Sequence, residues 1–186
     1  NQKSFRREDL VIFTKCGLKV PHSSQPGIRI KHYDTSSKHI IESVESSLRK
    51  LRTDYIDIFL LNHLDPISNI EETALTLMQL KNSGKVKNIG ITNFSVFQHQ
   101  LLASFLSTPI VTNHIELNLL NTSALDNGQI DYIKQRYMKP LASAPLADGR
   151  IAHGKNDLAI KVRNKLQKNA LKYGMEIGSE AVACVI

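Results

Sequence analysis

Residues 55–61 read YIDIFLL, a short apolar run in which Asp57 is the single charged residue. Runs of this length that are rich in apolar, β-branched and aromatic side chains are typical of strands buried on both faces of a parallel sheet. Working outward, similar runs occur at 9–15, 87–92 and 110–115, and a weaker one occurs at 138–142. The sequence therefore predicts about five strands.

Helical patterns separate these runs. We expect helices at 40–51, 70–80, 95–106, 130–136 and 157–173, and a last one from 179 onward. Thr35 and Ser36 can cap the first of them, and Gly84 follows the second at a position where helices often end. Strands and helices that alternate with short connections predict a parallel α/β fold whose strands are covered by helices.

Two architectures share this alternation, a doubly wound sheet and a (β/α)₈ barrel. No Gly-x-Gly-x-x-Gly turn follows any of the predicted strands, which argues against a Rossmann dinucleotide site and favours part of a barrel. About five strands do not close an eight-stranded barrel. We therefore expect residues 1–186 to form a single, incomplete barrel domain.

Composition narrows the classes of partner. The formal net charge of +7 is compatible with nucleic acid, an acidic membrane or a phosphorylated cofactor. The basic residues are scattered, and those between Lys155 and Lys172 fit a solvated helix face. Without an aromatic or helix-turn-helix pattern, and without a long apolar segment, we expect neither nucleic-acid nor membrane binding.

The cysteines point to a reducing compartment. Cys16 and Cys184 are far apart in the sequence, so neither a disulfide framework nor a zinc site is indicated, and no metal site is expected. We predict a cytoplasmic protein. The first residues, Asn1-Gln2-Lys3, include no initiator Met, which suggests an excerpt of a longer chain.

Polar residues follow the predicted strands at their carboxyl ends. In barrels of this kind, active sites are assembled at that edge from several different strand ends. The candidates are Lys15, Asn62, Thr92, Asn93, Asn113, His114 and Glu116.

Five motifs in this order resemble the aldo/keto reductase family, in the branch of small bacterial reductases that is also similar to potassium-channel β subunits. They are FTKCG at 13–17, DYID at 54–57 with Asp65-Pro66, GKV at 84–86 with IGITNF at 89–94, Asn113 with Glu116, and Pro145-Leu146-Ala147 with Gly149. The resemblance implies a (β/α)₈ barrel of which this chain holds about five parallel βα units, without the amino-terminal strands and the last strand.

The resemblance also implies a reaction. In this family NADPH delivers hydride to an aldehyde or ketone while a tyrosine, aided by lysine, aspartate and usually histidine, handles the proton. Lys15 matches the family lysine, and the Tyr and Asp would precede the first strand. Asn62 stands where the histidine is usual; it can donate a hydrogen bond to a carbonyl but cannot take up a proton. His63 should point away from the Asn62 face by strand alternation, unless a bulge shifts it, and fits a loop histidine.

Cofactor contacts follow from the same resemblance. Thr92 and Asn93 match the pair that binds the nicotinamide carboxamide. His114 replaces the usual Gln, and Ser143 replaces an aromatic residue that stacks on nicotinamide in relatives. Leu146, Gly149 and Arg150 belong to a loop that can approach a pyrophosphate, although a solvated Arg150 is the common alternative.

Two hypotheses remain. The first is a cytoplasmic, NADP(H)-dependent oxidoreductase acting on a small-molecule carbonyl substrate. The second is a catalytically inactive relative, such as a cofactor-sensing or interaction module, which the departures at Asn62, His114 and Ser143 favour. Substrate identity, the preference for NADP over NAD, and oligomeric state cannot be predicted from these residues.

Overall fold

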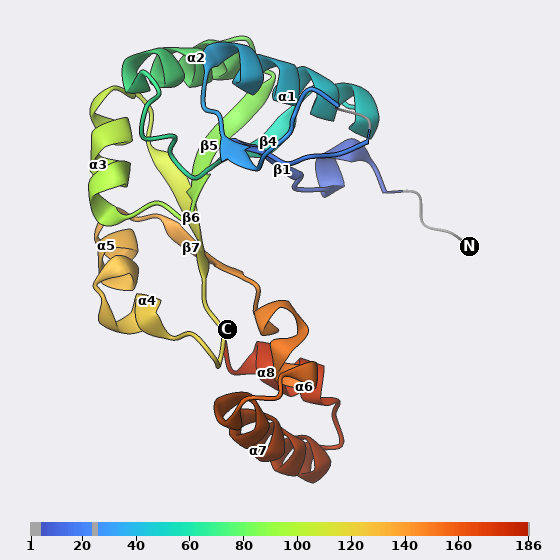
Figure 1. Ribbon diagram of the computed structural model, residues 1–186. Helices are drawn as coiled ribbons and strands as arrows, with labels where there is room; N and C mark the ends of the chain where they lie inside the picture. The colour runs from blue at the N-terminus through green and yellow to red at the C-terminus, as the bar shows by residue number, and fades with distance from the viewer. Residues whose placement is uncertain (1–4, 24–25, 186) are drawn as a thin grey trace. The chain divides into compact units, whose positions relative to one another are not determined.

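A computed structural model describes residues 5–23 and 26–185 (Figure 1). The chain divides into two compact units, one ending at Asn113 and one beginning at His114. The first contains 3-10 helix η1 (Arg7–Asp9), β1 (Phe13–Cys16), β2 (Leu18–Lys19), β3 (His32–Tyr33), α1 (Ser37–Leu51), β4 (Ile56–Asn62), α2 (Ile70–Asn82), β5 (Val86–Thr92) and α3 (Val96–Ser104). β6 (Ile110–Glu116) contains the division, and α4 (Ser123–Asp126), α5 (Gln129–Gln135), β7 (Lys139–Ser143), η2 (Ala147–Gly149), α6 (Arg150–His153), α7 (Asp157–Tyr173) and α8 (Ile177–Ala183) follow.

The main sheet has five parallel strands in the order β1-β4-β5-β6-β7. This order follows the chain, with α1, α2 and α3 in the first three connections and α4 and α5 in the last. The expected parallel α/β architecture is therefore confirmed. The expectation of a single domain over residues 1–186 stays a prediction.

Helices cover one face of the sheet in the first unit. α1 packs on β1 and α2, and α2 packs on β5. Ile40 of α1, Phe59 of β4 and Ile89 of β5 are fully buried between these layers. Ser36 caps α1 by accepting a hydrogen bond from the His39 backbone at 3.3 Å, as the sequence predicts.

The first strand is shorter than expected. The expected strand covers 9–15, whereas β1 begins at Phe13 and Asp9 ends η1. The Asp9 carboxylate stabilises η1 by accepting hydrogen bonds from the Arg6 backbone at 3.1 Å and from the Arg6 side chain at 3.3 Å. A second difference is the small antiparallel pair of β2 with β3, which the sequence analysis does not predict. This pair aligns Tyr33 with Leu18, two residues after the carboxyl end of β1.

The second unit has its own small core. Ala147, Ile151, Leu166 and Ala181 are buried together, with Leu119, Leu120, Val162 and Ile177 packed around them. α7 spans the predicted residues, capped by Asn156, whose side chain accepts from the Ala159 backbone at 2.8 Å. α6 and α8 both pack on α7.

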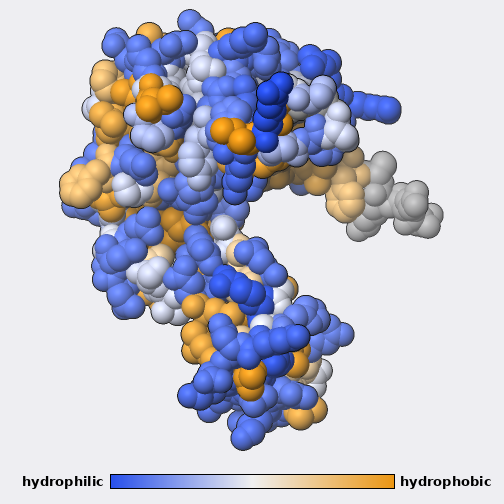
Figure 2. All heavy atoms as spheres, in the orientation of Figure 1, coloured by the Kyte–Doolittle hydropathy of each residue, from blue (hydrophilic) through white to orange (hydrophobic). Residues whose placement is uncertain are grey.

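Apolar side chains remain at parts of the surface (Figure 2). On the edge strand, Phe13 is 42% exposed, and Val11 just before it is 68% exposed. No helix in the described part of the chain is long and apolar enough to cross a membrane.

Candidate functional site

Three predicted site residues share one face of the sheet in the first unit. The register aligns Lys15 with Leu60 and Asn62 with Thr92. Side chains alternate along a strand, and aligned residues of neighbouring strands face the same side. Lys15, Asn62 and Thr92 therefore lie near the carboxyl ends of β1, β4 and β5, on the face opposite to the one that the helices cover.

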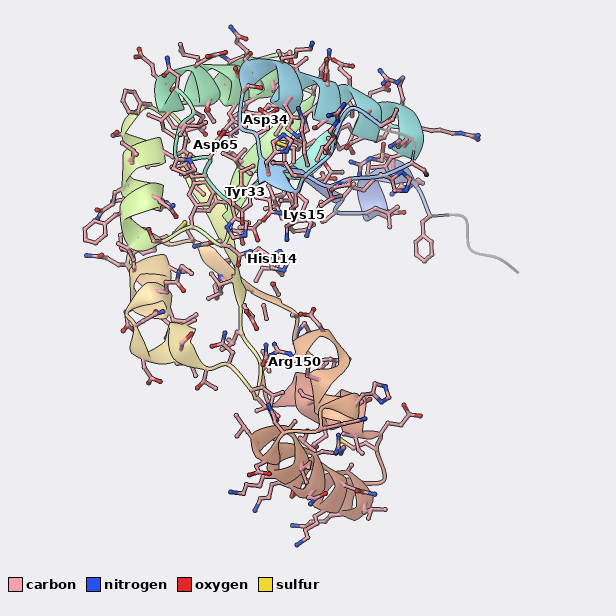
Figure 3. The ribbon with its side chains drawn as sticks, in the orientation of Figure 1. Lys15, Tyr33, Asp34, Asp65, His114 and Arg150 are labelled. Carbon is pink, nitrogen blue, oxygen red and sulfur yellow. The ribbon has the colours of Figure 1, made fainter. Side chains whose placement is uncertain are left out.

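These three side chains differ in their surroundings. Lys15 is exposed (Figure 3), and no described residue forms an ion pair with it. Thr92 is 2% exposed, and Asn62 is half-buried. The arrangement offers a cation, an amide and a hydroxyl along one edge of the sheet.

Asn93 and His63 meet just beyond the ends of β5 and β4. Both have left-handed backbones, with φ of 58° at Asn93 and 60° at His63. The His63 backbone N–H donates to the Thr92 carbonyl at 3.0 Å, and the Asn93 Nδ2 lies 3.3 Å from the His63 Nε2. His63 is in a loop, as expected, but strand alternation does not set its direction because β4 ends at Asn62.

Tyr33 packs against the His63 ring. The two ring centroids are 4.8 Å apart with 35° between their planes. Next to Tyr33 in sequence, the buried Thr35 donates to the Ser68 hydroxyl at 2.7 Å, and the Thr35 carbonyl accepts from Thr73 at 2.8 Å. These bonds fix the chain after β3 to the loop and helix that follow His63.

Two titratable groups near this edge are shifted. Burial, and then the positive charge of Lys31, lower the pKa of His63 below its usual value. Burial, reinforced by the Asp34 carboxylate, raises the pKa of Cys16 to about 12. The lowered pKa favours the neutral form of His63, and the raised pKa keeps the Cys16 thiol protonated and unavailable as a nucleophile.

Asn113, the last residue of the first unit, is buried and donates to the Phe94 carbonyl at 3.1 Å. The remaining predicted site residues lie in the second unit. His114 belongs to β6, and Ser143 ends β7. Leu146 is 40% exposed. Arg150 (Figure 3) donates to the Ala147 carbonyl at 3.0 Å and pairs with the Glu116 carboxylate at 3.4 Å. Arg150 is exposed and is held by its own loop and by Glu116 at the end of β6.

The loop after β7 has an unusual backbone. Ala144, Ala147, Asp148 and Gly149 all have positive φ, between 49° and 82°. Left-handed conformations at non-glycine residues are uncommon and tend to occur at functional sites. Backbones that combine left- and right-handed residues can also turn successive N–H groups toward one anion.

Described residues form no group of three or more His, Cys, Asp or Glu side chains that could hold a metal ion. The site therefore offers a cation, amides, hydroxyls and backbone groups as its chemistry.

A family model, described as the aldo/keto reductase family, matches residues 1–183. The chain belongs to this family.

Relatives with known names agree with this membership. The 6-dehydroglucose reductase of Agrobacterium fabrum is 45% identical over 116 residues, which are 62% of this chain and 39% of that protein. The glycerol dehydrogenase of Gluconobacter oxydans has a similar fold, with a TM-score of 0.80 at 22% identity, over 95% of this chain and 59% of that one. An aldo/keto reductase from Klebsiella pneumoniae in complex with NADP and acetate matches with a TM-score of 0.66 at 22% identity, over 92% and 54%.

These matches place the five strands within a barrel fold. The chain spans less than two thirds of the length of each of these relatives. It therefore contains part of an aldo/keto reductase barrel, consistent with the predicted fold class.

Two parts of the site are not predicted by the sequence patterns. Tyr33 has no predicted role, because two-residue strands such as β3 have no readable period. The contact between His63 and Asn93 is the second. The residue types at 63 and 93 are one signal of the left-handed backbones found there, because His and Asn adopt such backbones more readily than most residues.

Proposed function

We propose that this chain supplies the cofactor-binding and carbonyl-binding edge of an NADP(H)-dependent aldo/keto reductase. The observation that carries the proposal is the shared face of Lys15, Asn62 and Thr92 at three adjacent strand ends. Family membership makes oxidoreductase chemistry the expected activity. The family uses NADP(H), and the Klebsiella relative is a complex with NADP.

The residues present fit such a cofactor. The Thr92 hydroxyl and the exposed Asn93 amide suit the polar groups of a nicotinamide carboxamide. The loop from Ala144 to Gly149 is the proposed pyrophosphate contact. The Ala147 and Gly149 N–H groups donate within this loop, to the Ala144 and Leu146 carbonyls at 2.7 and 3.1 Å, so the other backbone N–H groups of the loop and the Arg150 side chain would hold the anion. When bound, NADPH supplies the hydride for carbonyl reduction.

Each side chain near the carbonyl then has a distinct role. The Asn62 amide donates a hydrogen bond to the substrate oxygen and so orients it. The Lys15 ammonium provides a positive electrostatic field. This field favours the ionised form of a neighbouring hydroxyl that donates the proton, and so lowers the pKa of that hydroxyl. The proposed substrates are small aldehydes or ketones. The proposed cofactor contacts in the second unit are His114, Ser143, Leu146 and Arg150.

The test is NADPH binding to the purified chain, followed by nicotinamide fluorescence, with NADH in parallel. Thr92→Val should weaken NADPH binding about threefold to tenfold, which corresponds to one hydrogen bond of about 1 kcal/mol. Thr76→Val is the matched control, because the Thr76 hydroxyl bonds only to the Glu72 carbonyl of its own helix, at 2.8 Å. No binding by the unmodified chain, or equal binding by the Thr92 variant, would contradict the proposal.

A second candidate function is a cofactor-sensing relative without turnover. Asn62 favours it, because an amide cannot exchange a proton as an imidazole can. Carbonyl-dependent NADPH oxidation distinguishes the two candidates, with Lys15→Met as the control for the enzyme. Tight NADPH binding without oxidation, unchanged in Asn62→His, would favour the sensing module.

A further inference from the structure

The contact between His63 and Asn93 has a defined direction. An amide nitrogen such as Asn93 Nδ2 carries only donor hydrogens, so the His63 Nε2, 3.3 Å away, must be the acceptor. The imidazole therefore carries its proton on Nδ1. Two residues on neighbouring strand ends are thus joined by a side-chain hydrogen bond as well as by the backbone bond from His63 to Thr92.

The surrounding contacts keep the His63 ring in place. Tyr33 packs on one side of it at 4.8 Å, and Thr35 ties that segment to Ser68 in the loop after His63. The left-handed backbone at His63 turns its side chain toward the end of β5. His63 therefore presents a fixed acceptor to Asn93.

We propose that His63 is a positioning residue for the cofactor, which fixes the orientation of the Asn93 amide by accepting its hydrogen bond. This inference rests on the proposed function, in which Asn93 binds the nicotinamide carboxamide. An amide group is planar, with its oxygen and nitrogen on opposite branches. Holding the nitrogen at His63 leaves the Asn93 oxygen free to accept from the carboxamide NH₂ of the cofactor.

Protonation of His63 should disturb this arrangement. An imidazolium has N–H on both ring nitrogens, so it cannot accept from Asn93, and the amide would have to turn its oxygen toward His63. The groups that act on the ring are the Lys31 charge and the Tyr33 ring of the β3 segment, and the uncharged Asn93 just after β5. Cofactor affinity should therefore fall as the pH falls through the lowered pKa of His63.

The experiment measures NADP⁺ binding by calorimetry at about pH 8 and about pH 5, on either side of the ordinary histidine pKa. His63→Ala should bind about threefold to tenfold more weakly at the higher pH, as expected for one lost hydrogen bond. His63→Gln retains an acceptor near the Nε2 position at every pH. It should bind within about twofold of the unmodified chain at the higher pH.

The comparison at the lower pH is the decisive one. Titration of the 2′-phosphate of NADP⁺ affects every variant alike, so the informative quantity is the affinity ratio between the His63→Gln variant and the unmodified chain. This ratio should shift in favour of the Gln variant as the pH falls. His22→Gln, at an exposed histidine of the same unit, is the matched control and should follow the unmodified chain.

A second readout needs no cofactor. Nitrogen NMR of the free chain should show His63 protonated on Nδ1, and the Asn93 side-chain amide signals should move as His63 titrates. NADP⁺ binding that is equal in the unmodified chain and His63→Ala at both pH values would overturn the inference and leave the proposed function standing. Absent NADP⁺ binding, with Asn93 signals that still follow His63, would overturn the proposed function and the cofactor role of His63 with it.

Discussion

Gly17 sets how closely the end of β1 approaches the end of β4. A Cβ atom at this position would lie 2.5 Å from the Asn62 backbone oxygen. The φ of Gly17 is 109°, a conformation that other residues rarely adopt. Both the close approach and the backbone angle require glycine. The spacing between Lys15 and Asn62 therefore depends on a residue that touches neither side chain.

Gly17→Ala should be more destabilising than Gly84→Ala. Gly84 also has a positive φ, of 77°, but its Cβ would meet no atom within 4 Å, so that variant carries only backbone strain of about 1 kcal/mol. Gly17→Ala adds a collision with backbone atoms, for which about 1 to 3 kcal/mol more is expected. Urea denaturation of both variants measures the difference, and equal losses would mean that the strand ends can move apart freely.

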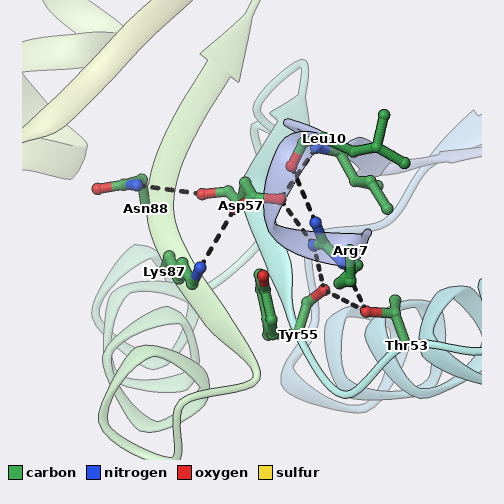
Figure 4. Close-up of polar contacts among 8 residues, drawn as sticks. Arg7, Leu10, Thr53, Tyr55, Asp57, Lys87 and Asn88 are labelled. Carbon is green, nitrogen blue, oxygen red and sulfur yellow. Dashed lines mark hydrogen bonds and ion pairs between the residues drawn. The ribbon is translucent and has the colours of Figure 1, made fainter. Parts of the chain in front are cut away.

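At the amino end of the sheet, one carboxylate links three elements. Asp57 of β4 accepts from the Ile12 backbone at 3.0 Å, pairs with Arg7 at 2.6 Å and lies 3.4 Å from the Lys87 ammonium (Figure 4). Arg7 and Lys87 also lie over the Tyr55 ring, at 3.9 and 3.6 Å from its centre. Since this cluster is at the strand ends opposite to Lys15 and Asn62, its role is stability rather than chemistry.

Stability should depend on pH through Asp57. Burial alone would raise its pKa, but the hydrogen bonds from Ile12 and Arg7 and the nearby positive charges outweigh burial and hold the pKa below its usual value. A carboxyl with a lowered folded-state pKa stabilises the fold above its unfolded pKa of about 4, and this contribution is lost as the pH falls through the folded value. Asp57→Asn should cost about 2 kcal/mol at neutral pH.

The cost of Asp57→Asn should shrink as the pH is lowered below the unfolded pKa of about 4, because the unfolded chain then binds a proton at this carboxyl. Chemical denaturation across this range measures it. Asp54→Asn, at an exposed position just before the same strand, is the control and should change little. A loss that stays constant at every pH would show that the charge of Asp57 does not stabilise the fold.

Sequence patterns predicted the long elements better than the short ones. α7 was predicted at its observed bounds, and α1 and α2 close to theirs, because an apolar face and a capping residue are both readable. Lys15, Asn62 and Thr92 could be placed at one edge because each lies at the carboxyl end of a predicted parallel strand. The contact of Tyr33 with His63 could not, because it depends on a two-residue strand and on a left-handed backbone after β4.

The two compact units divide the chain at β6, and each has its own buried residues. Leu77 of α2 is 1% exposed in the first unit, and Leu166 of α7 is 3% exposed in the second. Proposed cofactor contacts occur in both, Thr92 and Asn93 in the first and Gly149 in the second. The two units can therefore unfold together or separately.

Two variants, Leu166→Ala and its counterpart Leu77→Ala, test whether the units unfold together or separately. Each removes buried side-chain volume and should cost about 2 to 5 kcal/mol in its own unit. If the units open separately, hydrogen exchange measured by mass spectrometry should speed up after residue 113 in Leu166→Ala and before it in Leu77→Ala. Equal acceleration across the whole chain in both variants would instead support one cooperative domain over residues 1–186, because a single domain opens with one free energy. In that case a packing change in α7 would weaken NADPH binding at Thr92 by lowering the folded fraction alone, without any contact with the cofactor.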